Sequence, residues 1–184
     1  MIVSAILALS ALTLTANSAG EFSQSGTMKI DNGQERSATL HVGCSPDPDG
    51  GAFVIELIAT EANTRKDFDY DNFEGPDAAA GAKALSHVVW KSAAGTIEIT
   101  HAAAGSYLPE PRESFMFGID QLSRRRGPAA TLLAGVGVDA GQLVWTQTGF
   151  DDAKHKLTAT FTFDAATAQR LRDTASACLP TSKH

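Results

Sequence analysis

The sequence predicts a mainly β fold, an antiparallel β-sandwich-like domain with a C-terminal α-helix that one disulfide attaches to the sheet. Short segments that alternate apolar and polar residues recur along the chain, with Gly, Pro, Asn and Asp between them. Residues 164–178 then change to a helical period. The chain has two cysteines, Cys44 and Cys178.

Residues 1–19 are expected to be a signal peptide, followed by a single domain over residues 20–184. Residues 2–14 form an apolar run without a charge, and small residues at 16–19 offer a cleavage site. This run is too short for the roughly 20 apolar residues of a membrane-spanning helix. The basic residue that normally precedes such a run is missing, so a buried N-terminal helix or strand is the alternative. We expect a periplasmic or secreted protein without a membrane span.

The overall charge argues against a nucleic-acid partner. The formal net charge is −6 and the isoelectric point is about 5.3, so no broad basic surface can neutralise nucleic-acid phosphates. The five histidines are scattered, and no CxxC, HxxxH or HExxH spacing is present. We therefore expect no nucleic-acid partner and no cofactor.

The period-two pattern, together with β-branched and aromatic residues, predicts the strands. They are expected at residues 27–30, 39–44, 53–60, 85–91, 96–100, 114–119, 142–147 and 156–163. Turn residues join them into hairpins, and Asn32-Gly33 favours a type I′ turn. The clearest strand is 156–163, whose apolar residues fall on one face and whose threonines fall on the other.

A helix is expected to begin after Asp164, a good N-cap residue, and to end before Pro180. One apolar stripe on it consists of Ala168, Leu171, Ala175 and Cys178. Cys44 lies on the inward face of a strand, so a disulfide with Cys178 would fasten the helix to the sheet. A metal pair or two free buried thiols is the alternative for these residues.

For two segments in the middle of the chain, the sequence does not decide the secondary structure. Residues 63–84 are compatible with a short helix or a loop, and residues 132–138 with a strand or a helix.

The acidic segment 67–74 places carboxylates at alternate positions, as at the start of a calcium-binding loop. Asn72 and Ala78 stand where such a loop needs glycine and glutamate. The simpler interpretation is a strand that turns Phe68 and Tyr70 inward and its acids to solvent. An acidic contact surface for a basic partner is a further alternative.

Two groups of residues are candidates for binding a partner. The first group is Gly105, Ser106 and Tyr107. These small residues and one aromatic ring precede Pro109 and Pro111, which predicts a stiff loop that could fill a partner's cleft. An ordinary turn between strands is the alternative. The second group is Arg124, Arg125 and Arg126. This positive cluster suits an anion or an acidic partner, and a solvated loop is its alternative.

The sequence lacks the usual signature of a nucleophilic enzyme. No G-x-S-x-G motif is present, and no carboxylate is singled out as a general base. His101 lies near Ser106 in sequence, which keeps a small secreted hydrolase as an alternative. We expect no enzyme activity.

Parts of the sequence resemble two known exported families. Residues 38–44, a strand around Trp90 and residues 159–178 look like exported two-cysteine proteins of the VasI-like, type VI secretion-associated kind. This resemblance implies a periplasmic sandwich with a structural disulfide and an accessory role.

Residues 104–108 are similar to the Ser-Gly-x-Tyr loop of periplasmic inhibitors of invertebrate-type lysozyme. In those proteins the loop enters the lysozyme active site. The resemblance implies contact roles for Gly105 and Tyr107, with Ser106 as a neighbour. Here Ala104 stands in place of the family's serine, which removes a polar contact.

The leading functional hypothesis is an exported, non-catalytic module that binds another protein in the periplasm, as an inhibitor or immunity-type factor. The alternatives are a secretion-system accessory or envelope structural protein, and the small hydrolase.

Overall fold

The computed structural model describes residues 20–45, 52–109, 113–121, 127–137, 139–176 and 178–179. The expected signal peptide, residues 1–19, lies outside this part of the chain. The strands formed in it are β1 (Glu21–Ile30), β2 (Arg36–Ser45), β3 (Ala52–Ala59), β4 (Ser86–Ser92), β5 (Gly95–His101), β6 (Ala104–Tyr107), β7 (Phe115–Gln121), β8 (Gly141–Thr148) and β9 (Lys156–Phe163). They form one sheet in the order β5-β4-β8-β9-β1-β2-β3-β7-β6, and neighbouring strands are antiparallel.

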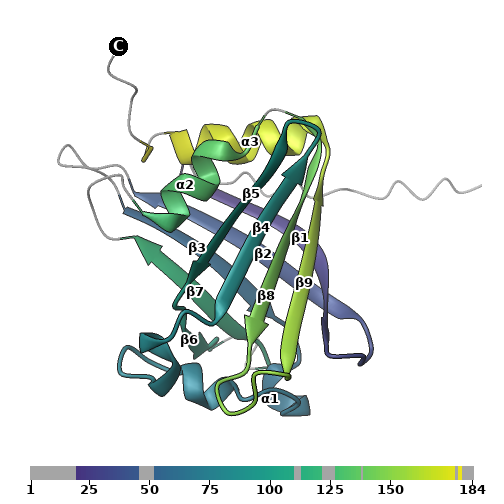
Figure 1. Ribbon diagram of the computed structural model, residues 1–184, viewed down its shortest axis with the longest axis vertical. Helices are drawn as coiled ribbons and strands as arrows, with labels where there is room; N and C mark the ends of the chain where they lie inside the picture. Colours follow the sequence, from purple (N-terminus) through teal and green to yellow (C-terminus); the bar gives the residue numbers. More distant parts are fainter. Residues whose placement is uncertain are drawn as a thin grey trace, which may run out of the picture.

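The sheet curls so that its two halves face each other across a shared core. In Figure 1, β5, β4, β8 and β9 lie in front of β1, β2, β3 and β7. Strand β1 joins the halves, because residues 21–28 pair with β2 and residues 27–30 pair with β9. At the start of the β9 pairing, a Cβ on Gly26 would lie 2.3 Å from the carbonyl oxygen of Thr160. The predicted mainly β, sandwich-like fold is confirmed.

Alternate strand residues fill the space between the two halves, as the period-two pattern predicted. The buried residues of β9 are Leu157, Ala159, Phe161 and Phe163. Trp90 in β4 and Trp145 in β8 are also buried in this core. The predicted hairpins are confirmed, although the first strand begins earlier than expected, at Glu21.

The turn between β1 and β2 differs from the prediction. A type I′ turn needs positive φ at two central residues. Here Asp31 has a φ of 50°, whereas Asn32 and Gly33 do not have positive φ. The side chain of Asp31 gives the physical reason, because its Oδ1 accepts a hydrogen bond from the backbone N–H of Lys156 at 2.8 Å. This bond ties the turn to the start of β9.

Two helices, α2 (Pro128–Gly135) and α3 (Ala165–Ser176), cover one end of the sandwich (Figure 1). Asp164 caps α3 as predicted, since its Oδ1 accepts the backbone N–H of Thr167 at 2.7 Å. The predicted disulfide between Cys44 and Cys178 is present, with 5.9 Å between the Cα atoms. Both cysteines are buried, so the bond fastens the C-terminal end of α3 to β2. Among the described residues, no helix is both long enough and apolar enough to cross a membrane.

The opposite end is closed by short turns: α1 (Ala62–Arg65), η1 (Tyr70–Phe73) and η2 (Ala79–Ala82). The strand that was the simpler interpretation of residues 67–74 is therefore wrong. Phe68 and Tyr70 do point inward as expected, and Phe73 joins them. Their rings pack on Phe117, at centroid distances of 5.3–6.1 Å. A tight turn brings all three rings to one side, which an extended strand cannot do.

Candidate functional site

The end opposite the long helices is held by an ion pair between a buried arginine and an exposed aspartate. Arg36 lies at the start of β2, and its side chain is 4% exposed. Its guanidinium lies 3.1 Å from Asp67 Oδ2 and donates to the carbonyl oxygen of Thr60 at 3.2 Å. A buried cation is stable when it is paired and hydrogen-bonded in this way. The pair fixes the segment after α1 against the sheet.

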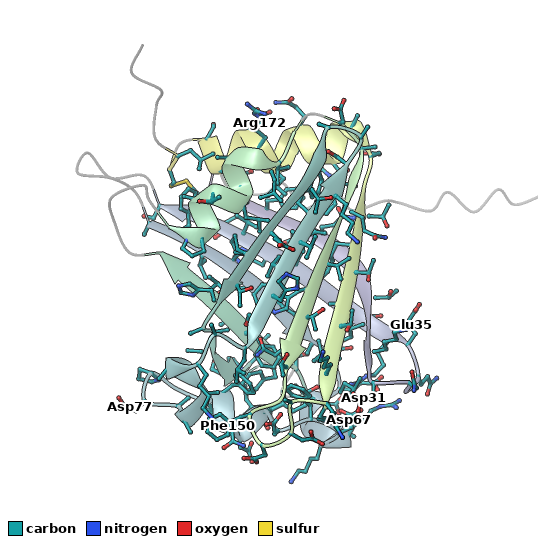
Figure 2. The ribbon with its side chains drawn as sticks, in the orientation of Figure 1. Asp31, Glu35, Asp67, Asp77, Phe150 and Arg172 are labelled. Atoms are coloured by element: carbon teal, nitrogen blue, oxygen red, sulfur yellow. A yellow bond between two sulfur atoms is a disulfide. The ribbon has the colours of Figure 1, made fainter. Side chains whose placement is uncertain are left out.

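His155 is a second connection at this end. Its Nδ1 lies 2.7 Å from Asp31 Oδ2, its Nε2 lies 2.9 Å from the carbonyl oxygen of Asp67, and its ring stacks on Phe68. Burial acts to lower the pKa of His155, but the Asp67 carbonyl and the Asp31 carboxylate together raise it above the ordinary value. Both ring nitrogens are engaged, so His155 joins three segments that are distant in sequence. Figure 2 shows Asp31, Asp67 and Phe150 gathered at this end.

Asp69 anchors the turn between β8 and β9. Its Oδ2 accepts the backbone N–H groups of Phe150 at 2.6 Å and Asp151 at 3.3 Å. Its Oδ1 is buried and has no hydrogen-bond partner among the described residues. Gly149 keeps this site compact, because a Cβ there would lie 3.2 Å from Asp69 Oδ1.

Tyr107 closes the site from the side of β6. Its hydroxyl donates to Asp71 Oδ1 at 2.8 Å. Burial first, and then the hydrogen bond and charge of Asp71 together with the charge of Glu74, raises the pKa of Tyr107 well above the ordinary value. The phenol therefore lies in a negative potential and stays protonated.

These elements surround a surface pocket of about 370 Å³, which we call the Tyr70 pocket. Its lining residues are Lys66, Phe68, Asp69, Tyr70, Asp71, Asn72 and Tyr107. Tyr70 is 1% exposed and burial raises its pKa to about 12, an effect that the nearby Arg36 guanidinium opposes. The Arg36 guanidinium donates to Thr60 and Asp67 and also lies beside the Tyr70 hydroxyl. The buried Tyr70 hydroxyl makes no well-formed hydrogen bond among the described residues.

The segment around Gly105, Ser106 and Tyr107 is an edge strand, so both the predicted stiff loop and its alternative, an ordinary turn between strands, are wrong. The four residues of β6 pair with β7, and the carbonyl oxygen of Gly105 accepts the N–H of Gly75 at 2.8 Å. A Cβ on Gly105 would lie 2.2 Å from the Phe115 ring, so glycine permits this close packing. The side chain of Tyr107 still reaches the Tyr70 pocket, and a binding role for the three residues stays a prediction.

The second predicted group, Arg124, Arg125 and Arg126, lies outside the described residues, and its role stays a prediction.

The acidic segment does not have the geometry of a calcium loop. Asp67 pairs with Arg36, Asp69 accepts backbone N–H groups, and Asp71 accepts the Tyr107 hydroxyl. Within the described part of the chain, no group of three or more His, Cys, Asp or Glu residues could hold a metal ion. The carboxylates are directed to separate protein partners.

His101, the candidate base of a hydrolase, has its Nδ1 2.7 Å from the carbonyl oxygen of the adjacent Ala102. The sequence analysis missed Arg36, Asp31 and His155 as parts of the site. A lone arginine or histidine has no spacing that would reveal its partners, although the Asp-Asn-Gly turn did mark the position of Asp31.

Comparison with family models, with curated proteins and with solved structures found no match to this chain.

Proposed function

We propose that this protein is an exported, non-catalytic module that binds another protein, as an inhibitor or immunity-type factor, through the end that carries the Tyr70 pocket. The observation that carries the proposal is the pocket itself. It is polar, the half-buried Tyr107 lines it beside the buried Phe68 and Tyr70, and ion pairs from distant segments hold it in place. Preorganised aromatic side chains lose little entropy on binding, so they suit protein recognition.

The contacts of the titratable groups support binding over catalysis. A general base must be free to take a proton from a substrate. At this end both nitrogens of His155 are engaged, and Asp67 and Asp69 are held by Arg36 and by backbone N–H groups. Their role is to position the pocket wall.

The disulfide supports export, because such bonds persist in oxidising compartments such as the periplasm. Since β6 lies within the sheet, contact with a partner would be made by the side chain of Tyr107 at the pocket, and not by a loop that enters a cleft.

The test is binding to a panel of purified lysozymes and secreted bacterial toxins, measured by biolayer interferometry. We expect at least one panel member to bind, and Tyr107→Ala to weaken that complex by about tenfold or more, as for an aromatic anchor residue. Thr96→Ala is the matched control, because Thr96 is exposed on β5 and does not line the Tyr70 pocket. Binding that Tyr107→Ala leaves unchanged would exclude this face, and a panel without any binder would contradict the inhibitor proposal.

A further inference from the structure

His155 lies between two groups that can only accept hydrogen bonds. Its Nδ1 is 2.7 Å from Asp31 Oδ2, and its Nε2 is 2.9 Å from the carbonyl oxygen of Asp67. The Asp31 carboxylate is ionised, since its hydrogen bond from the backbone N–H of Lys156 lowers its pKa. A neutral imidazole carries one N–H, whereas an imidazolium carries two. Only the imidazolium can therefore make both contacts.

The ring of His155 is fixed in its plane, so it cannot turn to relieve a mismatch. It stacks on the buried ring of Phe68, with 5.3 Å between centroids and 19° between the planes. When the imidazolium loses a proton, the remaining N–H stays with the Asp31 carboxylate, because charge-assisted hydrogen bonds are the stronger ones. The lone pair of Nε2 then faces the Asp67 carbonyl oxygen, and the two acceptors must separate.

Asp67 connects this ring to the rest of the polar end. Its carboxylate pairs with Arg36 at the start of β2. Two residues further on, Asp69 accepts backbone N–H groups of the turn between β8 and β9. Residues 67–69 are therefore attached at three points, and the bond to His155 is the one that a change of pH near neutrality removes.

The charged groups around the ring come from three parts of the chain. They are Asp31 in the β1–β2 turn, Asp67 and Asp69 before η1, and Asp152, Lys154 and Lys156 next to His155 itself. Burial acts against the charged ring, but the Asp67 carbonyl and the carboxylates of Asp31 and Asp69 outweigh it, so the pKa of His155 is raised. The contact with Asp67 is thus complete below the ordinary value of about 6.5 and is lost as pH rises through the folded-state value.

We propose that His155 is a pH-dependent latch, which as an imidazolium ties residues 67–69 to the β1–β2 turn and on deprotonation releases them. The two acceptors that it joins, Asp31 and Asp67, lie at the same end of the molecule (Figure 2). The latch goes beyond the proposed binding function and does not depend on it.

The test is NMR on the disulfide-bonded protein with ¹⁵N-labelled histidine, between about pH 5 and 9. Long-range ¹H–¹⁵N spectra report the protonation of each ring nitrogen. Both nitrogens of His155 should carry a proton at low pH, and Nδ1 alone should keep one at high pH. Amide hydrogen exchange, measured in parallel, should show protection of residues 67–69 falling about tenfold over this range, as for the loss of one hydrogen bond to a charged group.

Asp31→Asn is the variant that separates a latch from a purely structural contact. Asparagine tolerates the φ of 50° at this position, and its amide can donate to His155 Nδ1 while its oxygen accepts the Lys156 N–H. A neutral His155 with its proton on Nε2 then satisfies both neighbours. The contact with Asp67 should persist at high pH, and the change in protection should fall below about twofold.

His87→Gln is the matched control and should keep the wild-type pH dependence, because His87 is exposed on β4 and its Nε2 lies 3.3 Å from Glu98. A neutral His155 at the low-pH end, or equal protection of residues 67–69 throughout the range, would overturn the inference. An Asp31→Asn protein with the wild-type pH dependence would do the same. None of these outcomes bears on the binding test with Tyr107→Ala.

Discussion

The two ends of the sandwich are closed by different kinds of interaction. At one end, apolar faces of α2 and α3 cover the core, and a disulfide fastens α3 to β2. At the other end, short turns are held by Arg36, Asp69 and His155, which reach segments far away in the sequence. The first end contributes stability with few directed polar contacts. The second holds side chains in a defined arrangement around a pocket, and leaves two polar atoms without partners. The two ends of one small sheet are thus stabilised in different ways.

Removing the disulfide should have the largest effect, and it tests whether the two ends are stabilised independently. Cys178→Ser should lower the free energy of unfolding by about 2–5 kcal/mol, because the unfolded chain regains the freedom of a loop spanning 134 residues. Chemical denaturation without reductant measures the change, and the Cys44→Ser/Cys178→Ser double variant controls for the unpaired thiol. Amide hydrogen exchange should rise in α3 and change little in residues 67–73. Equal loss of protection at both ends would show that the ends are not separate.

Arg36→Met tests the polar end and should have the next largest effect. We expect a loss of about 2 kcal/mol, because the carbonyl of Thr60 and the carboxylate of Asp67 lose their donor. Hydrogen exchange should now rise in residues 67–73 while α3 stays protected. Arg65→Met is the control, since its ion pair with Glu61 is exposed and worth less than about 0.5 kcal/mol. If Arg36→Met is as stable as wild type, the Arg36–Asp67 ion pair does not stabilise this end.

Two histidines, His155 at the polar end and His41 in the middle of the sheet, should make stability depend on pH. On the outer face of β2, a hydrogen bond from His41 to Glu56 raises the pKa of His41, and the pKa of His155 is also raised. A raised folded-state pKa gives a contribution that is complete below the unfolded value of about 6.5 and disappears as pH rises through the folded value. Both His41→Gln and His155→Gln should therefore cost more stability at about pH 5.5 than at about pH 8.5.

The two histidine variants should differ in location. His155→Gln is expected to raise hydrogen exchange in residues 67–73 at low pH, whereas His41→Gln is expected to act on β2 and β3. A larger cost at high pH for either variant would contradict the assigned partner.

Calcium should produce the smallest effect. Because Asp67, Asp69 and Asp71 are directed to separate protein groups, about 1 mM CaCl₂ should leave the melting temperature unchanged relative to the same concentration of MgCl₂. A calcium-specific rise of more than about 2 °C would show that these carboxylates converge on a cation.

The helix-capped end could be predicted from the sequence because its signals are local. Asp164 caps a helix whose apolar stripe includes Cys178, and the alternation in β9 marks the face on which the helix packs. Helix and strand propensities and the spacing of apolar residues depend on neighbouring positions, so a single sequence is enough to detect them.

The polar end depends on pairs that no local pattern reveals. Arg36 and Asp67 are 31 positions apart, Asp69 and Phe150 are 81 apart, and Asp31 and His155 are 124 apart. Strand β6 was missed for a related reason, since Ala-Gly-Ser-Tyr has weak strand propensity and its conformation comes from pairing with β7.

The position of the disulfide also determines how the molecule would respond to mechanical force. The bond encloses residues 45–177 in a covalent loop, so tension between the two chain ends passes through the sulfur atoms and bypasses most strands. Strand β1 lies outside that loop, yet it is the strand that joins the two halves of the sheet. Tension between the chain ends would therefore extend β1 and most of β2 after β1 separates from β9, whereas the residues enclosed by the disulfide could not be extended.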